Sequence, residues 1–266
     1  MTADRLLILS PRVTDTRLQL AAAAHRRNLR TAVAHGWRRP DDATTGTPAH
    51  LYGGPLLADC LGHALGLAPL EPPADWLARL PPELACRQVE AVTLAEARRL
   101  RRPAFVKPPG DKHFPARIHP DGSRLPGPDA MDDDLPVLVS DIVCFVREYR
   151  LFVLDGEVRT ASRYATGPAL DMAPLDDDPR DADVRAFARE VLAAAEGTLP
   201  SAVVVDVGLL DDGRWAVVEA NPAWASGGYA CDPERVLDVV VRAAAPVAET
   251  SAYDLGFARP LPEVVG

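Results

Sequence analysis

Apolar and polar positions in the first third of the chain follow a β-α-β order. An apolar run at residues 5–10 predicts a buried strand, a helical stripe at residues 14–27 predicts a helix, and residues 31–35 predict a second strand. Two further helical patterns, at residues 55–67 and 73–80, are expected to cover this small sheet. We therefore expect a small α/β domain at the N-terminus.

The pattern changes after a proline pair, where we divide the chain into an N-terminal domain of residues 1–85 and a second domain of residues 86–266. The second domain opens with a short helix that Thr93 caps and whose capping box Glu96 completes. Further strands are predicted at residues 104–107, 116–119 and 137–140, hairpins at residues 148–164 and 203–221, and helices at residues 182–196 and 233–245. Antiparallel hairpins mixed with helices indicate an α+β fold and not a doubly wound sheet.

The second hairpin has polar residues where apolar ones are expected. An Asp-Gly pair at residues 212–213 is a favoured two-residue turn, and pairing outward from it places Asp206 opposite Glu219. Asn221 follows on the same face. The opposite, apolar face is expected to turn toward a core and carries Val203, Val205, Val207 and Leu209 against Ala216, Val218 and Ala220.

Facing carboxylates on this hairpin would have Cβ atoms roughly 5 Å apart, and such charges repel unless a positive group lies between them. Two carboxylates and an amide oxygen suit Mg²⁺, or Mn²⁺ in its place, held jointly by the protein and by phosphate oxygens. The alternative is an exposed hairpin whose polar face meets water. These residues alone leave both interpretations open.

The first hairpin follows the same logic around an Asp-Gly turn at residues 155–156. Pairing from this turn places Glu148 opposite Arg163, and the polar face would gather Glu148, Arg150, Arg159 and Arg163. The opposite face would carry Tyr149, Leu151, Val153 and Val158. Arginines gathered on one face form an anion site, because each guanidinium presents a fixed fork for carboxylate or phosphate. A surface ladder of salt bridges is the alternative.

Other candidates have weaker signals. Lys107 ends an apolar strand and Lys112 lies in a loop bounded by proline and glycine, positions from which a lysine either reaches a phosphate or is simply solvated. Residues 141–143 connect these strands to the first hairpin and offer backbone groups and a carboxylate to a heterocycle. After the second hairpin, Gly227 and Gly228 either direct N–H groups at an anion or form a flexible tether.

Composition narrows the class of protein. The 266 residues are 47% hydrophobic, enough for one large or two medium domains, and the net charge of −9 argues against nucleic-acid or anionic-membrane binding. No run approaches the roughly 20 apolar residues of a membrane span, and MTADRLLILS lacks a signal-peptide pattern, so we expect a cytoplasmic location. The four scattered cysteines indicate neither a zinc site nor a disulfide framework.

The chain lacks the GxxxxGK[ST], GxGxxG, HExxH and GxSxG motifs. It has instead, in order, a strand-borne lysine in FVKPPGDKHFPARI, a linker acid, the strand FVREYRLFV, and Asp206 followed by VVEANP. This order resembles the ATP-grasp superfamily of ATP-dependent carboxylate-amine ligases, in particular its short stand-alone members, over about residues 88–245. The resemblance implies two α+β subdomains that clasp ATP. The loop PPGDKHFP departs from the family pattern because it is short and has no run of glycines.

The resemblance implies a ligase that joins a small-molecule or peptide carboxylate to an amine through an acyl phosphate, with ATP and Mg²⁺ as cofactors. The residues that it implies for contacts with ATP are Lys107, Lys112, Asp141, Ile142, Val143 and Glu148. Those that it implies for the metal are Asp206, Glu219 and Asn221. Arg150 and Arg163 would stabilise the transferred phosphate.

No nucleic acid or membrane is expected as a partner, and the oligomeric state stays open, a homodimer included. Two other functions fit the same residues. One is a regulatory module that binds nucleotide without ligase activity, and the other is a metal-dependent phosphohydrolase that uses the same acids. ADP release that needs both an acid and an amine would separate the ligase from both alternatives.

Overall fold

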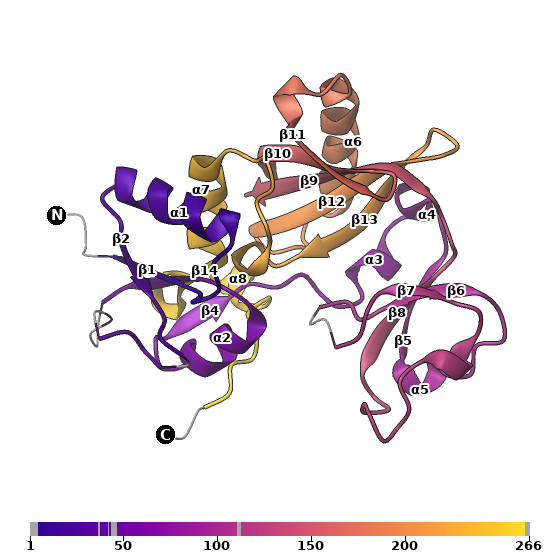
Figure 1. The fold of residues 1–266 in the computed structure, drawn as a ribbon, viewed down its shortest axis with the longest axis horizontal. Helices are drawn as coiled ribbons and strands as arrows, with labels where there is room; N and C mark the ends of the chain where they lie inside the picture. The colour runs from indigo at the N-terminus through magenta and orange to yellow at the C-terminus, as the bar shows by residue number, and fades with distance from the viewer. Residues whose placement is uncertain (1–4, 37, 42, 44–46, 111–112, 264–266) are drawn as a thin grey trace.

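The computed structural model describes residues 5–36, 38–41, 43, 47–110 and 113–263. Within these ranges, Figure 1 shows an N-terminal part on one side, a large twisted sheet in the middle and a smaller sheet on the other side. The C-terminal helices return to the N-terminal part. This arrangement confirms the α+β class, because most of the strand pairing in the second half of the chain is antiparallel.

The N-terminal part contains a parallel sheet with the strand order β2-β1-β3. Its elements are β1 (Leu6–Leu9), α1 (Asp15–Arg26), β2 (Arg30–Val33), β3 (Ala49–Tyr52) and α2 (Pro55–Leu61). Every residue of β1 is buried, as its apolar run predicts. Thr14 begins α1 as a cap, since its side chain accepts a hydrogen bond from the backbone N–H of Arg17.

The smaller sheet is antiparallel and has the order β5-β8-β6-β7. Its elements are β5 (Val89–Thr93), α5 (Leu94–Ala97), β6 (Ala104–Lys107), β7 (Arg117–His119), η1 (Gly122–Arg124) and β8 (Pro136–Ser140). The capping box predicted between Thr93 and Glu96 is present. The sequence pattern did not predict β5, whose side chains are half-buried or exposed.

The central sheet is antiparallel and has the order β11-β10-β9-β12-β13. Its elements are β9 (Phe145–Leu154), β10 (Glu157–Thr166), β11 (Ala169–Pro174), η2 (Leu175–Asp177), α6 (Asp181–Ala194), β12 (Ala202–Leu210) and β13 (Trp215–Asn221). One face packs against α6, through Val203 and Val205 among others. The other face packs Phe152 and Val204 against the N-terminal part. Because both faces are covered, β12 is buried along its whole length.

The remaining elements connect these parts. They are β4 (Leu67–Pro69), α3 (Trp76–Arg79), α4 (Pro82–Ala85), η3 (Ala223–Ala225), α7 (Pro233–Ala243), β14 (Ala244–Pro246), η4 (Val247–Glu249) and α8 (Ala252–Leu255). The helix expected at residues 73–80 does not cover the N-terminal sheet as predicted, because Trp76 and Leu77 pack into the core of the central sheet. No helix in the described ranges is long and apolar enough to cross a membrane.

Candidate functional site

The two acidic residues that were predicted to face each other do so. Asp206 on β12 is the direct partner of Glu219 on β13, and Asn221 lies two residues further along β13. Nearer the turn the predicted pairing is wrong, since Leu209 pairs with Trp215. A bulge after Asp206 shifts the register by one residue and so restores the predicted pair at the site.

The same bulge changes which side chains of β13 face the core. Val217 packs with Val205 and Val207 in the core under α6, where Val218 was predicted. Val218 instead lines a cavity beside Glu219. The bulge therefore presents two consecutive residues of β13 to the same cavity.

The arginine face predicted for the first hairpin does not form. Two irregularities in β10 shift its register against β9, so that Arg163 pairs with Tyr149 and not with Glu148. Arg163 consequently lies on the opposite face of the sheet from Arg150, where it forms ion pairs with Asp171 and Asp178. The structure thus removes Arg163 from the site. Arg159 is exposed and lies near Asp238 at the surface, so it does not contribute either.

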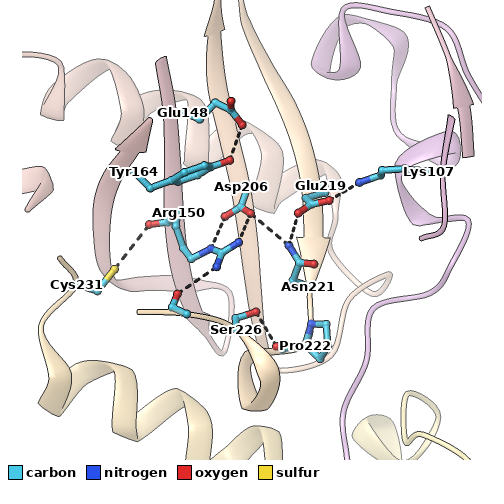
Figure 2. A network of polar contacts seen from close by, with 11 residues as sticks. Lys107, Glu148, Arg150, Tyr164, Asp206, Glu219, Asn221, Pro222, Ser226 and Cys231 are labelled. Carbon is cyan, nitrogen blue, oxygen red and sulfur yellow. Dashed lines mark hydrogen bonds and ion pairs between the residues drawn. The ribbon is translucent and has the colours of Figure 1, made fainter. Parts of the chain in front are cut away.

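Arg150 and Asp206 form the buried centre of the site, where β9 and β12 lie side by side (Figure 2). Nε and Nη2 of Arg150 donate to the two carboxylate oxygens of Asp206 at 2.9 and 2.6 Å, and Nη1 donates to the carbonyl oxygen of Gly227 at 3.1 Å. Burial disfavours the charge of Arg150, but the Asp206 carboxylate raises the pKa of the guanidinium, which stays protonated. An arginine therefore offsets the repulsion expected between the facing carboxylates.

Glu219 lies at the edge of this centre and is charged. Its Oε1 accepts a hydrogen bond from Asn221 Nδ2 at 2.8 Å, and its Oε2 forms an ion pair with Lys107 at the end of β6 (Figure 2). Burial alone would raise the pKa of Glu219, but the Lys107 ammonium and these hydrogen bonds hold it below its ordinary value. The Lys107–Glu219 pair thus connects the smaller sheet to the central sheet across the site.

Two tyrosines that the sequence did not indicate complete the site. Tyr164 Oη donates to Glu148 at 2.5 Å, and burial raises the pKa of Glu148. The ring of Tyr164 stacks on Tyr229 with 4.9 Å between centroids, and the Arg150 guanidinium lies 5.6 and 4.9 Å from the two rings. Tyr164 reaches the site through the bulge in β10, and Tyr229 through a backbone φ of 48° that a bulky residue rarely adopts.

A cavity of about 520 Å³ lies between the two antiparallel sheets, and we name it the linker cavity. Its apolar walls include Phe105, Ile118, Leu138, Phe145 and Val218. Asp141, Ile142, Val143 and Glu148, all predicted for nucleotide contacts, line it as well. The Asp141 carboxylate accepts a hydrogen bond from the backbone N–H of Gln88 at 3.0 Å, and so holds the linker segment in place.

Arg87 and Gly208 shape the linker cavity, and the sequence analysis missed both. Arg87 donates to the carbonyl oxygens of Val217 and Val218 at 2.8 and 3.2 Å, and its guanidinium lies 5.6 Å from the centre of the Phe145 ring. A Cβ atom at Gly208 would lie 2.5 Å from that ring. A glycine inside an apolar strand is a signal for such a close approach, and it could have pointed to this wall.

A second cavity, of about 580 Å³, lies on the other side of the Lys107–Glu219 pair. We name it the proline cavity, because its lining includes Pro55, Pro72, Pro73, Pro109 and Pro222. Arg150, Asn221 and Tyr229 line this cavity and not the linker cavity. Lys112, predicted to contact phosphate, lies outside the described residues.

The loop after β13 closes the proline cavity and is anchored at both glycines, so the flexible-tether interpretation is not supported. The backbone N–H of Gly228 donates to Thr16 Oγ1 at 2.8 Å, and the carbonyl oxygen of Gly227 accepts from Arg150. The hydroxyl of Tyr52 donates to the carbonyl oxygen of Ser226 at 3.0 Å. The N-terminal part thereby fixes the loop that carries Tyr229.

The residues predicted for the metal offer oxygen donors of the kind that Mg²⁺ prefers. Asn221 Nδ2 lies 3.3 Å from Asp206 Oδ2 and 2.8 Å from Glu219 Oε1, so all three side chains converge. A half-turn of the Asn221 amide brings its oxygen to the same place. In the described ranges, no group of three or more His, Cys, Asp or Glu side chains is arranged to hold a metal ion. A cation here would therefore need the amide and ligand oxygens in addition to the two carboxylates.

The comparisons with known proteins agree with this geometry. Residues 84–239 match a family model described as an ATP-grasp domain, the second family of its clade. Among solved structures, D-alanine–D-alanine ligase from Bacillus anthracis aligns with a TM-score of 0.56 at 14% identity, over 91% of this chain and 97% of that chain. D-cycloserine synthetase DcsG aligns with a TM-score of 0.53 at 16% identity, over 88% and 98%. At these identities the likeness shows the fold alone. No curated protein matches the sequence significantly.

Proposed function

Because the chain belongs to the ATP-grasp family, we propose that it is an ATP-dependent ligase that joins a carboxylate to an amine through an acyl phosphate. The observation that carries the proposal is the wall between the two cavities. Lys107, Tyr164 and Glu219 are polar residues that line both of them, so a molecule in one cavity can reach a molecule in the other past these side chains.

We infer that the nucleotide occupies the linker cavity. The flat space between two apolar sheet faces suits a heterocycle, and the backbone of residues 141–143 offers donors and acceptors to its edge. Glu148, oriented by Tyr164, would accept hydrogen bonds from the ribose. The phosphates would then extend toward Lys107, whose ammonium neutralises their charge. Lys112 is proposed to assist from the adjoining loop.

Asp206, Glu219 and Asn221 are proposed to hold Mg²⁺ at the inner end of the linker cavity. The ion would supply charge neutralisation on the β- and γ-phosphates. Arg150 contributes a second fixed positive charge at the same place, because Asp206 and Gly227 hold its guanidinium in one orientation. Such preorganised charge is the main means by which proteins favour phosphoryl transfer.

In the proposed reaction, a carboxylate oxygen of the acid forms a bond to the γ-phosphorus of ATP, and the bond to the bridging oxygen of ADP breaks. The amine nitrogen then attacks the carbonyl carbon of the acyl phosphate. Phosphate leaves, the nitrogen loses a proton, and an amide remains. The protein's residues mainly position the reactants and exclude water, since the acyl phosphate hydrolyses if water reaches it.

ADP release tests this proposal. We expect release only when ATP, Mg²⁺, a suitable acid and a suitable amine are all present. ADP release with water alone would favour a phosphohydrolase, and tight nucleotide binding without turnover across a broad panel of acids and amines would favour a regulatory module. Either outcome would overturn the ligase assignment.

A further inference from the structure

We propose that the acid substrate is a monocarboxylate whose body is uncharged and apolar, with a ring as its preferred form, and that this body lies in the proline cavity. The inference rests on the proposed ligase function and deepens it by naming the class of acid. Its basis is the state of the charged groups in the cavity wall and the chemistry of the remaining lining.

The described charged residues of the proline cavity are all paired with other protein groups. Lys107 forms an ion pair with Glu219, and Arg150 forms a bidentate pair with Asp206. Glu71, further out along the cavity, is paired with Arg259 at 2.8 Å. A second carboxylate on the substrate would therefore find no uncompensated cation among these residues, and an ammonium group would find no uncompensated anion.

The charged residues also occupy defined places. Lys107, Arg150 and Glu219 lie together at the wall shared with the linker cavity or beside it, where the phosphate and the attacking carboxylate must meet. Among the described charged residues, only the Glu71–Arg259 pair lies away from that wall. The reacting carboxylate thus uses the charges at the inner end, and the rest of the acid lies beyond them.

The lining beyond the reacting end is mostly apolar. Trp76, Leu77 and Ala225 contribute side chains to it, in addition to the prolines that define the cavity. The polar atom of Trp76 is used elsewhere, since its Nε1 donates to Thr198 Oγ1. Tyr229 adds an aromatic ring and a hydroxyl. Rigid rings of this kind favour a flat or cyclic partner, because little conformational entropy is lost on contact.

The size of the cavity agrees with such a body. A volume of about 580 Å³ falls within the range of roughly 300 to 1,000 Å³ that is typical of small-molecule sites. Burying an unpaired charge in a lining of this kind is costly, whereas an apolar ring gains from leaving water. The cavity should therefore select against a second charge more strongly than against size.

Hydroxamate formation tests the inference without knowledge of the amine. Hydroxylamine attacks the acyl phosphate through nitrogen, phosphate leaves, and the product gives a coloured iron complex. The full-length protein is assayed with ATP, Mg²⁺, hydroxylamine and one of three matched acids. These acids are 3-phenylpropionate, phenylalanine, which adds an ammonium group, and glutarate, which replaces the ring by a second carboxylate.

We expect 3-phenylpropionate to give the highest initial rate at equal, low concentration, at least tenfold above each of the other two acids. An equal or higher rate with glutarate or phenylalanine would overturn the inference while leaving the ligase function standing. If no acid from a wider panel of carboxylates gives hydroxamate or ADP, the ligase function fails and the inference fails with it.

A charge introduced into the wall gives an independent check. Ala74 is exposed and lines the proline cavity, so a longer side chain can be placed there without disturbing the core. Ala74→Lys should raise the rate with glutarate relative to 3-phenylpropionate at least fivefold, because it supplies the missing cation. Ala74→Gln, of similar length but neutral, should keep the ratio within twofold of the unmodified protein. An unchanged ratio in Ala74→Lys would show that the acid does not lie in this cavity.

Discussion

Arg150 and Arg163, both from the β9–β10 hairpin, form similar ion-pair clusters on opposite faces of one sheet. Arg150 is held by Asp206, and Arg163 is held by Asp178 together with Asp171. In each cluster an aspartate side chain without exposed surface is compensated by an arginine that is nearly buried. Burial and pairing are therefore the same in both clusters and do not distinguish them.

What distinguishes the two clusters is what lies beside them. Arg150 lines the proline cavity. The Arg163 cluster instead ties β11 and the turn after η2 to the central sheet, since Asp171 belongs to β11 and Asp178 follows η2. A buried ion pair is thus weak evidence for a functional site unless a cavity is open to it.

The largest effect is expected from Glu219→Gln. This change removes the charge that Lys107 and the proposed metal share but keeps the shape of the side chain, so turnover should fall at least ~100-fold while the protein stays folded. The measurement is ADP release with an active acid and amine, together with the melting temperature. ATP affinity should also lose its dependence on Mg²⁺, which titration with and without EDTA would reveal. Activity close to that of the unmodified protein would count against the metal assignment.

The next prediction separates the two arginine clusters. Arg150→Met should abolish turnover, whereas Arg163→Met should keep at least half of it, because only Arg150 borders the proposed phosphate position. Arg163→Met should still lower the free energy of unfolding by about 2 to 3 kcal/mol, since it leaves buried Asp178 without its main partner. Assays at a temperature where both variants are folded provide the measurement. Equal losses of turnover in both variants would remove the distinction between the clusters.

The contrast between these arginines also shows what the sequence could predict. Strand identity, the antiparallel fold and the Asp206–Glu219 pair follow from alternation and turn type, and the structure has all of them. The neighbours of Arg163 do not follow, because each bulge moves every later residue of a strand to the other face. Local sequence patterns have no clear signal for a bulge. The pairing of Asp206 with Glu219 survived only because its bulge lies next to the site.

Residues that reach the site from distant parts of the chain could not be predicted for a second reason. Tyr229 depends on a positive φ and on a loop anchored to Thr16 of the N-terminal part, and Arg87 on a strand edge formed by β13. These are tertiary contacts between segments far apart in the sequence. The linker segment of residues 141–143 was found because its position between two predicted hairpins and strands already restricts where it can lie.

A smaller effect is expected from the ionisation of Glu148. Burial raises the pKa of Glu148 above its ordinary value of 4.5, so the folded state favours its neutral form. Stability from this group is present below pH 4.5 and is lost as the pH rises through the raised pKa. Glu148→Gln should therefore raise the melting temperature by about 1 to 3 °C at pH 7.5, with no gain at pH 4. It should also weaken nucleotide binding, as expected for a ribose contact.

Thermal unfolding at both pH values checks this sign, with Glu157→Gln on the exposed hairpin turn as the control. That variant should show no pH-dependent gain, because Glu157 is exposed. A gain for Glu148→Gln that is equal at pH 4 and pH 7.5 would mean that packing, and not charge, accounts for the difference.

The smallest effect is expected from Tyr164→Phe, which removes one hydroxyl and keeps the ring that stacks on Tyr229. Glu148 then loses the donor that orients it, and nucleotide affinity should fall about three- to tenfold, which is the value of one hydrogen bond to a charged group. Tyr229→Phe is the matched control, since its hydroxyl lies in the proline cavity and should leave nucleotide affinity unchanged. Calorimetric titration with ADP measures both variants. Equal losses in the two variants would mean that the aromatic pair acts as one unit and that the linker and proline cavities are not separate sites, because a hydroxyl in the second cavity would then influence the ligand in the first.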